Sequence, residues 1–336
     1  MRSWCVLSFF LFALISCKHK EDPQAAFYYW KTIYQTNSVQ KDLLNKTGNN
    51  KLYLRFFDVT WDEHKHDVKP NAVVHINESL TGLRVIPVIF ISNRVFERIA
   101  FSGADSLAKK CHDLVSILAA KANCSVQSVQ IDCDWTESTK EKYFSFLKFF
   151  KAFSRHSVQA TIRLHQVKYR ERTGVPPVDK GVLMFYNMGK ITAGGTASSI
   201  YNEKDAARYL SRLGSYPLPL DVALPLFSWV IQSRDGKLIQ IYSKITCNEL
   251  KDQRYFGALK DGFRAKKSLF LKGVYIKAND NFKPEKTNAD ILKKAADQLS
   301  DQLPSLKNRT IIYYELANIN LPEFTSETLN KVTNSF

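Results

Sequence analysis

The sequence alternates short apolar runs with amphipathic helical stretches, and this order constrains the fold more than any other feature. We expect the apolar runs to be strands at residues 27–34, 52–59, 85–92, 126–134, 158–165, 181–187 and 221–229. An eighth strand lies at 273–277 or 310–316. If both segments are strands the count is nine, so either one of them belongs to an added hairpin or the strand that closes the sheet is not identified. Strands that alternate with helices predict a parallel α/β sheet.

Four stretches between these runs have the period of helices with one buried face. Ser138 and Glu141 form a predicted capping box at the start of one helix. The other three predicted helices span residues 105–122, 203–213, with Asn202 as the N-cap, and 287–303.

Two neighbouring predicted strands carry polar residues on one face only. The polar faces consist of Gln130, Asp132 and Asp134 on the first strand and of Gln159, Thr161, Arg163 and His165 on the second. A strand in an open parallel sheet is covered on both faces and is apolar on both, whereas a barrel strand packs only one face against helices. We therefore predict an α/β fold, a (β/α)8 TIM-type barrel that is irregular in its last third, in a single domain over residues 27–336.

Catalytic residues of such barrels gather where the strands end. The candidates at these ends are Asp132, Asp134, Arg163, His165, Tyr186, Asn187 and Trp229, with Asp58 and Asp62 after the second strand and Glu315 if residues 310–316 close the barrel. Buried carboxylates need a cation or hydrogen-bond donors, so we expect Arg163 and His165 to be their partners. The alternative is a buried ion-pair layer without chemistry, with Tyr186 and Trp229 as core residues.

The N-terminus predicts export and lipid attachment. Arg2 precedes an apolar run at residues 6–15, and Leu14-Ile15-Ser16-Cys17 resembles the site that lipoprotein signal peptidase cuts. Residues 1–16 are then a signal peptide, and residues 17–26 are a lipidated Cys17 with a tether. Acyl chains such as palmitate on Cys17 would hold the protein on the membrane of a bacterial cell envelope. In the alternative, the protein is secreted and Cys17 is incidental.

Lys and Arg outnumber Asp and Glu by 48 to 32, which gives a net charge of +16. This excess favours acidic partners, namely a glycan or an anionic envelope polymer rather than nucleic acid, although a solvated basic surface is the simpler interpretation. We expect a monomer. We expect no cofactor, because no phosphate loop, HExxH or GxSxG motif is present. His64 and His66 favour a polar loop over a metal site, since no third ligand is evident.

Four cysteines remain after the predicted processing: Cys111, Cys124, Cys133 and Cys247. In an exported protein they form one or two disulfides or stay as buried free thiols.

The segments Gln130-Ile131-Asp132-Cys133-Asp134-Trp135 and Ala223-Leu224-Pro225-Leu226-Phe227-Ser228-Trp229 resemble exported bacterial TIM-barrel proteins related to glycoside hydrolases. Lys20-Glu21-Asp22 is similar to the export signals of surface lipoproteins in Bacteroidetes-type bacteria. The first segment is also similar to chitinase-type barrels, in which acidic residues at the end of strand four carry catalysis. Those barrels have a Glu at the position of Thr136. Glu137 is then either a displaced acid or the start of the next helix.

The resemblance implies glycan hydrolysis by two carboxylates, with a retaining and an inverting mechanism both open. We assign Asp134 as the general acid, Asp132 as an orienting carboxylate, and Arg163, His165 and Asn187 as sugar contacts, while Trp135, Tyr186 and Trp229 stack on the sugar. Two other functions compete: a carbohydrate-binding lipoprotein without catalysis, and a structural envelope protein.

Overall fold

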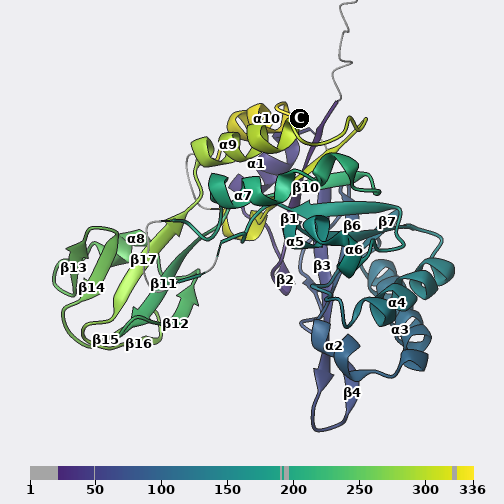
Figure 1. Ribbon diagram of the computed structural model, residues 1–336, viewed down its shortest axis with the longest axis horizontal. Helices are drawn as coiled ribbons and strands as arrows, with labels where there is room; N and C mark the ends of the chain where they lie inside the picture. Colours follow the sequence, from purple (N-terminus) through teal and green to yellow (C-terminus); the bar gives the residue numbers. More distant parts are fainter. Residues whose placement is uncertain (1–21, 49, 190, 193–196, 320–323) are drawn as a thin grey trace, which may run out of the picture.

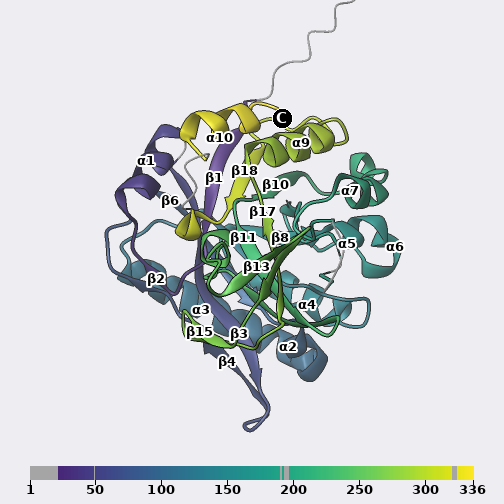
Figure 2. The ribbon, with the colours of Figure 1, turned by 90° about the vertical axis from the view of Figure 1, so that its left-hand side faces the viewer.

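The structure is a computed structural model that describes residues 22–48, 50–189, 191–192, 197–319 and 324–336. The predicted signal peptide and Cys17 lie outside these residues. Eight parallel strands close into a barrel (Figures 1 and 2) because β1 pairs with both β3 and β18. The barrel strands are β1 (Gln24–Tyr29), β3 (Lys51–Asp62), β6 (Arg84–Ile91), β7 (Ser128–Asp132), β8 (Ser157–Arg163), β9 (Lys180–Met184), β10 (Leu220–Pro225) and β18 (Thr310–Tyr314). The predicted (β/α)8 barrel is thus confirmed.

The two alternatives for the eighth strand have separate places in the fold. Thr310–Tyr314 is the closing strand, since it lies between β1 and β10. The other segment contributes β16 (Val274–Ile276), which forms an antiparallel hairpin with β15 (Leu269–Leu271). This is the added hairpin that the strand count allowed.

Helices cover the outside of the barrel. They are α1 (Ser38–Lys46), α2 (Asn93–Arg98), α3 (Ala104–Lys121), α4 (Lys140–Phe153), α5 (Leu164–Lys168), α6 (Arg170–Thr173), α7 (Glu203–Leu210), α9 (Ala289–Ser300) and α10 (Ser326–Thr333). The predicted cap of α7 is confirmed, because the Asn202 side chain accepts from the backbone N–H of Asp205. The predicted capping box at Ser138 is wrong. The N-cap of α4 is Thr139, whose hydroxyl accepts from the Thr136 backbone N–H and donates to Asn93 instead.

Side-chain alternation in β7 and β8 follows the predicted pattern. Val129 and Ile131 pack with the core under the helices, whereas Gln130 points into the barrel and accepts a 2.7 Å hydrogen bond from Tyr28 Oη. On β8, Gln159 and Thr161 point inward as well. Polar groups therefore fill part of the barrel interior, and each of these contacts satisfies a buried donor.

A separate sheet is inserted between β10 and α9, and we call residues 228–286 the insertion. Its strands β11 (Ser228–Arg234), β12 (Lys237–Tyr242), β13 (Phe256–Leu259), β14 (Gly262–Ala265) and β17 (Asn281–Lys286) form an antiparallel sheet in the order β12-β11-β17-β14-β13. The insertion also holds α8 (Cys247–Leu250) and has a hydrophobic cluster of its own around Val230, Phe256 and Phe282. It projects from one side of the barrel (Figure 1).

The remaining elements are small. β4 (Asp67–Asn71) pairs with the far end of β3, and His64 and His66 lie in the turn between them. β2 (Ile33–Tyr34) pairs with β5 (His75–Ile76), and three 3-10 turns lie at Phe101–Gly103, Leu213–Ser215 and Leu316–Asn318.

Two further predictions concern the cysteines and the metal ligands. Cys111, Cys124, Cys133 and Cys247 are all free thiols in the structure, so the disulfide alternative is wrong. The described part of the chain has no group of three or more His, Cys, Asp or Glu side chains that would hold a metal ion. Nor does any helix in it have both the length and the hydrophobicity needed to cross a membrane.

Candidate functional site

Two acidic side chains at the end of β7 meet two side chains of β8 at the barrel mouth. Thr161 Oγ1 donates a 2.7 Å hydrogen bond to Asp132 Oδ1. Arg163 contacts both carboxylate oxygens of Asp134, with Nε 2.5 Å from Oδ1 and Nη2 3.3 Å from Oδ2. Asp132 is buried, while the side chain of Asp134 is 53% exposed. The two neighbouring strands therefore bring the predicted Asp132, Asp134 and Arg163 together.

The electrostatics of these carboxylates differ. Burial raises the pKa of Asp132 from 3.8 to about 6, opposed by the guanidinium of Arg163 and reinforced by Asp134. Burial alone would lower the pKa of Arg163, but Asp134 and Asp132 raise it on balance, so the guanidinium stays charged. Asp134 is engaged by a two-point, charge-assisted contact and serves as a hydrogen-bond acceptor. The site thus pairs a carboxyl that titrates near neutrality with a carboxylate held by arginine.

An aromatic wall lies beside these charges, formed by Trp30, Tyr186, Phe227, Trp229 and Tyr314. Tyr186 stacks on Tyr314 with ring centroids 5.4 Å apart, and Phe227 packs against both rings. Trp229 lies 5.1 Å from Phe227, and Trp30 lies 5.7 Å from Tyr314. Trp30, Phe227, Trp229 and Tyr314 remain partly exposed. A row of accessible ring faces at a barrel mouth suits a ligand with flat apolar faces.

Tyr186 and Trp229 were predicted as site residues from the sequence, whereas Trp30, Phe227 and Tyr314 were not. Trp30 directly follows β1, Tyr314 ends β18, and Phe227 lies two residues after β10. Their positions at strand ends were the signal that could have found them, once the closing strand was known.

His165 and Asn187 border a small hollow beside Arg163 and Tyr186. Its volume is about 80 Å³, well below the range of about 300–1,000 Å³ that is usual for ligand pockets. The predicted position of His165 on β8 is wrong, because β8 ends at Arg163 and His165 belongs to α5. Burial lowers the pKa of His165, and Asp134 opposes this shift only in part. Neutral imidazole is therefore favoured at pH 7.

Two predicted site residues have partners other than Arg163. Trp135 is fully buried, stacks on Tyr143 at 5.2 Å and donates from Nε1 to the Thr173 carbonyl. Its predicted stacking on a sugar is wrong, because neither face of the indole is accessible. Glu137 is exposed in the loop before α4, and its carboxylate lies 2.7 Å from Arg172 Nη2. Glu137 therefore forms its salt bridge with Arg172 and not with Arg163.

The β3 side of the mouth adds charged groups. A bulge between Arg55 and Phe57 shifts the register of β3, so Arg55 lies over the Trp30 ring and 3.7 Å from Asp58 Oδ2. Glu315 accepts from the Trp30 backbone N–H, and burial raises its pKa as it does that of Asp58. Of the secondary candidates, Asp58 and Glu315 thus lie at the mouth. Asp62 instead pairs with Lys69 in the β3–β4 hairpin.

A larger hollow of about 430 Å³ adjoins the aromatic wall where the barrel meets the insertion. Phe227, Trp229 and Glu285 line it. Glu285 is buried and accepts from Trp229 Nε1 at 2.9 Å and from Ser199 Oγ at 2.6 Å. These donors, with Lys283, outweigh burial and lower the pKa of Glu285. Glu285 therefore fixes the orientation of the Trp229 ring.

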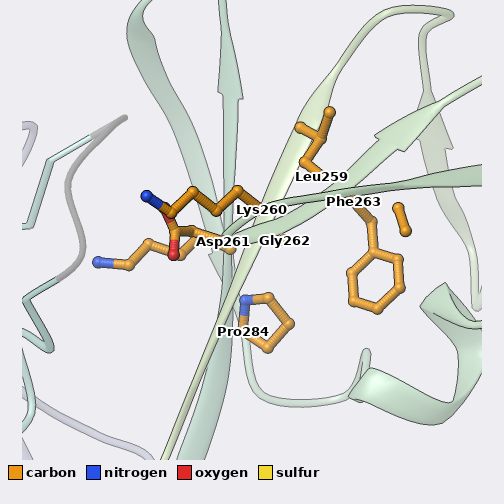
Figure 3. A pocket seen from close by; sticks show the side chains of 8 residues that line it. Leu259, Lys260, Asp261, Gly262, Phe263 and Pro284 are labelled. Atoms are coloured by element: carbon orange, nitrogen blue, oxygen red, sulfur yellow. The ribbon is translucent and has the colours of Figure 1, made fainter.

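A third hollow, of about 410 Å³, lies at the turn between β13 and β14 and is lined by Lys260, Asp261 and Pro284, among others (Figure 3). In the close view, Lys260 and Phe263 extend to opposite sides of the strand pair. None of the predicted site residues lines it. It is separate from the mouth.

No protein-family model matches this sequence, and no curated protein matches it. Solved structures share its fold. The spore cortex-lytic enzyme SleL of Bacillus megaterium QM B1551 is 14% identical over 95% of this chain and 75% of its own, with a TM-score of 0.55. SleL of Bacillus cereus is 14% identical over 94% and 75%, with a TM-score of 0.50. A chitinase of Chromobacterium violaceum ATCC 12472 is 10% identical over 92% and 98%, with a TM-score of 0.55. The chain therefore shares the (β/α)8 barrel fold of these two cortex-lytic enzymes and this chitinase.

Proposed function

We propose that this protein binds a glycan at the barrel mouth. The observation that carries the proposal is the Asp134–Arg163 pair beside the aromatic wall. Aromatic faces stack on the apolar faces of sugar rings, while a carboxylate and a guanidinium bond to sugar hydroxyls. The fold neighbours support the same ligand class, since they are spore cortex-lytic enzymes and a chitinase.

Binding without turnover is favoured over hydrolysis with Asp134 as the acid. A general acid must donate a proton to the leaving oxygen. Both oxygens of Asp134 instead accept hydrogen bonds from Arg163. Thr136 stands two residues further on, and Glu137 is paired with Arg172.

Glycan hydrolysis with Asp132 as the acid is the second candidate. Its support is the pKa of about 6, which leaves Asp132 partly protonated near neutral pH beside the carboxylate of Asp134. The burial of Asp132 and its bond from Thr161 argue against a role in proton transfer to a substrate.

Replacement of Arg163 tests glycan binding. We expect Arg163→Ala to weaken binding of chitin oligosaccharides or peptidoglycan strands, whichever the protein binds, by about tenfold or more, because it removes a charged hydrogen-bonding partner. Isothermal titration calorimetry measures this. Arg172→Ala is the matched control, since it also breaks an arginine–carboxylate pair, that of the exposed Arg172 and Glu137, which includes neither Asp134 nor Arg163. Equal affinities of the two variants would contradict the proposal.

A reducing-end assay on the same glycans separates the two candidates. Hydrolysis predicts that the wild type releases reducing ends and that Asp132→Asn does not. Binding alone predicts no release by either protein and unchanged glycan length. Release that survives Asp132→Asn would rule out Asp132 as the acid.

We further propose that the protein is a lipoprotein of a bacterial cell envelope, monomeric and anchored through Cys17. The proposal rests on the segment Leu14-Ile15-Ser16-Cys17 and the apolar run before it.

A further inference from the structure

The β15–β16 hairpin of the insertion exposes two aromatic rings. Phe270 is 76% exposed and Tyr275 is 55% exposed. They are direct cross-strand partners, and their ring centroids lie 5.2 Å apart. The hairpin lies at an end of the insertion, away from the barrel (Figure 1). The pair therefore forms one accessible aromatic surface, which we call the hairpin surface.

This surface is not needed to hold the hairpin in place. Side chains alternate along β15 and β16, so Ile276 is fully buried while Leu269 and Val274 pack against the insertion core. Those inward residues attach the hairpin to the insertion. Exposed Phe and Tyr rings lose the stabilisation that burial would give, which makes a binding role the better account of their position.

The segment that forms the hairpin surface is rich in lysine. Residues 266–277 include four exposed lysines, Lys266, Lys267, Lys272 and Lys277, and no acidic residue. Lys272 pairs with Glu249 at 2.5 Å, whereas the other three form no salt bridge within the described residues. The whole insertion has 13 Lys and Arg residues against six Asp and Glu residues. Its charge therefore selects a negatively charged partner.

We propose that the hairpin surface binds an anionic polysaccharide. The rings of Phe270 and Tyr275 pack against sugar faces, and Lys267 and Lys277 pair with the acidic groups of the polymer. The inference rests on the proposed function in one respect, because it assigns an acidic character to the glycan that the mouth binds. The two surfaces would hold the same polymer at separate points, which strengthens binding through a high effective concentration.

An anionic membrane is the other partner that such a surface fits, and the fold disfavours it. β1 begins at Gln24, at the N-terminal end of the barrel, where the proposed anchor would hold the membrane. The insertion instead follows β10 at the C-terminal end. The proposed anchor and the insertion that carries the hairpin surface are therefore connected to opposite ends of the barrel.

The test measures binding of the full chain to immobilised polygalacturonate, an anionic polysaccharide, with neutral dextran as the reference polymer. We expect the double variant Phe270→Ala with Tyr275→Ala to bind about tenfold more weakly than the wild type. The matched control is Phe149→Ala with Phe153→Ala, which removes two aromatic rings that are each 40% exposed on α4. Thermal melting of both variants confirms that they are folded.

A second pair of variants tests the charges. We expect Lys267→Gln with Lys277→Gln to weaken binding several-fold and to reduce its dependence on salt, whereas Lys110→Gln with Lys148→Gln on α3 and α4 leaves both unchanged. Wild-type affinity in the aromatic double variant would overturn the proposal. A second outcome would also overturn it: the wild type binds phosphatidylglycerol vesicles but not polygalacturonate, and the aromatic double variant no longer binds the vesicles. The two proposals can also fail separately. If Arg163→Ala has wild-type affinity for every glycan tested while the aromatic double variant no longer binds polygalacturonate, the proposal for the mouth is wrong and the proposal for the hairpin surface is supported.

Discussion

Asp132 shows how one buried side chain links the fold to the chemistry of the mouth. Its carboxyl lies in the barrel interior, where a negative charge is poorly solvated. Thr161 donates to it and Arg163 lies close by, yet burial dominates and the pKa rises to about 6. Above pH 6 the ionised carboxylate of Asp132 therefore lowers the free energy of unfolding. Such costs are typical of functional sites.

Asp132→Asn tests this account through stability. Because the pKa is 3.8 when unfolded and about 6 when folded, the folded protein binds more protons between these values, and its stability falls as pH rises through them. Asn stays neutral and still accepts from Thr161. We expect Asp132→Asn to be more stable than the wild type at pH 8, by an amount on the order of 2–3 kcal/mol, and similar to it at pH 4. Urea unfolding at both pH values measures the difference.

Asp301→Asn is the control for this experiment, since Asp301 is exposed at the end of α9. We expect this replacement of an exposed residue to change the free energy of unfolding by less than about 0.5 kcal/mol. If Asp132→Asn shows no dependence on pH, the carboxyl is not destabilised by burial.

At the scale of elements, the exact end of a strand decides which side chains reach the mouth. β8 ends at Arg163, so the next polar residue in the alternating pattern, His165, follows the period of a helix. The bulge in β3 instead adds a side chain to the mouth, because it turns Asp58 to the same side as Arg55. Both changes alter the site without changing the number or order of strands.

Gly262 tests the integrity of the insertion. A Cβ atom at this position would overlap the backbone carbonyl oxygen of Phe282, where β14 pairs with β17. We expect Gly262→Ala to destabilise the insertion by about 1–3 kcal/mol or more and to make residues 228–286 sensitive to limited proteolysis. Mass spectrometry of the fragments locates the cleavage.

Gly257→Ala on β13 is the matched change, because its Cβ would lie at an ordinary 3.5 Å from Lys266 Cε. We expect the wild-type cleavage pattern for this variant. Equal protection of the two variants would show that β14 and β17 tolerate a wider separation.

At the scale of the whole molecule, the two ends of the barrel serve different purposes. The N-terminal end closes around an ion pair of Lys180 and Asp221 at 2.8 Å, whereas the C-terminal end carries the mouth and the insertion. If lipid is attached at Cys17, the mouth faces away from the membrane, because β1 starts at the closed end. A polymer beyond the membrane surface would then meet both proposed binding surfaces.

Cys17→Ser tests the anchor. We expect the wild type to partition into the detergent phase of Triton X-114 and to carry acyl chains detectable by mass spectrometry, because several chains give stable membrane binding. The variant should enter the aqueous phase. Cys5→Ser, which lies in the predicted signal peptide, leaves the wild-type result unchanged. Aqueous partition of the wild type would favour the secreted alternative.

The barrel and the core of its site could be predicted from local sequence patterns. Apolar and polar residues alternate in β7 and β8 with a period of two, and this period alone assigns Asp132 and Thr161 to the interior and Ile131 to the helix layer. The helices with a strong 3.6-residue period, such as α3 and α4, were predictable for the same local reason.

Which residues share the mouth depends on contacts between distant parts of the chain. Trp135 and Trp229 both follow apolar strand segments in the sequence. Trp135 packs on Tyr143 in the core, whereas Trp229 lies beside Phe227 at the mouth. The closing strand, the insertion and the exposed pair of Phe270 and Tyr275 depend on pairings between distant segments. Local periodicity reports only which face of an element is buried, whereas the partner that buries it is set by contacts far along the chain.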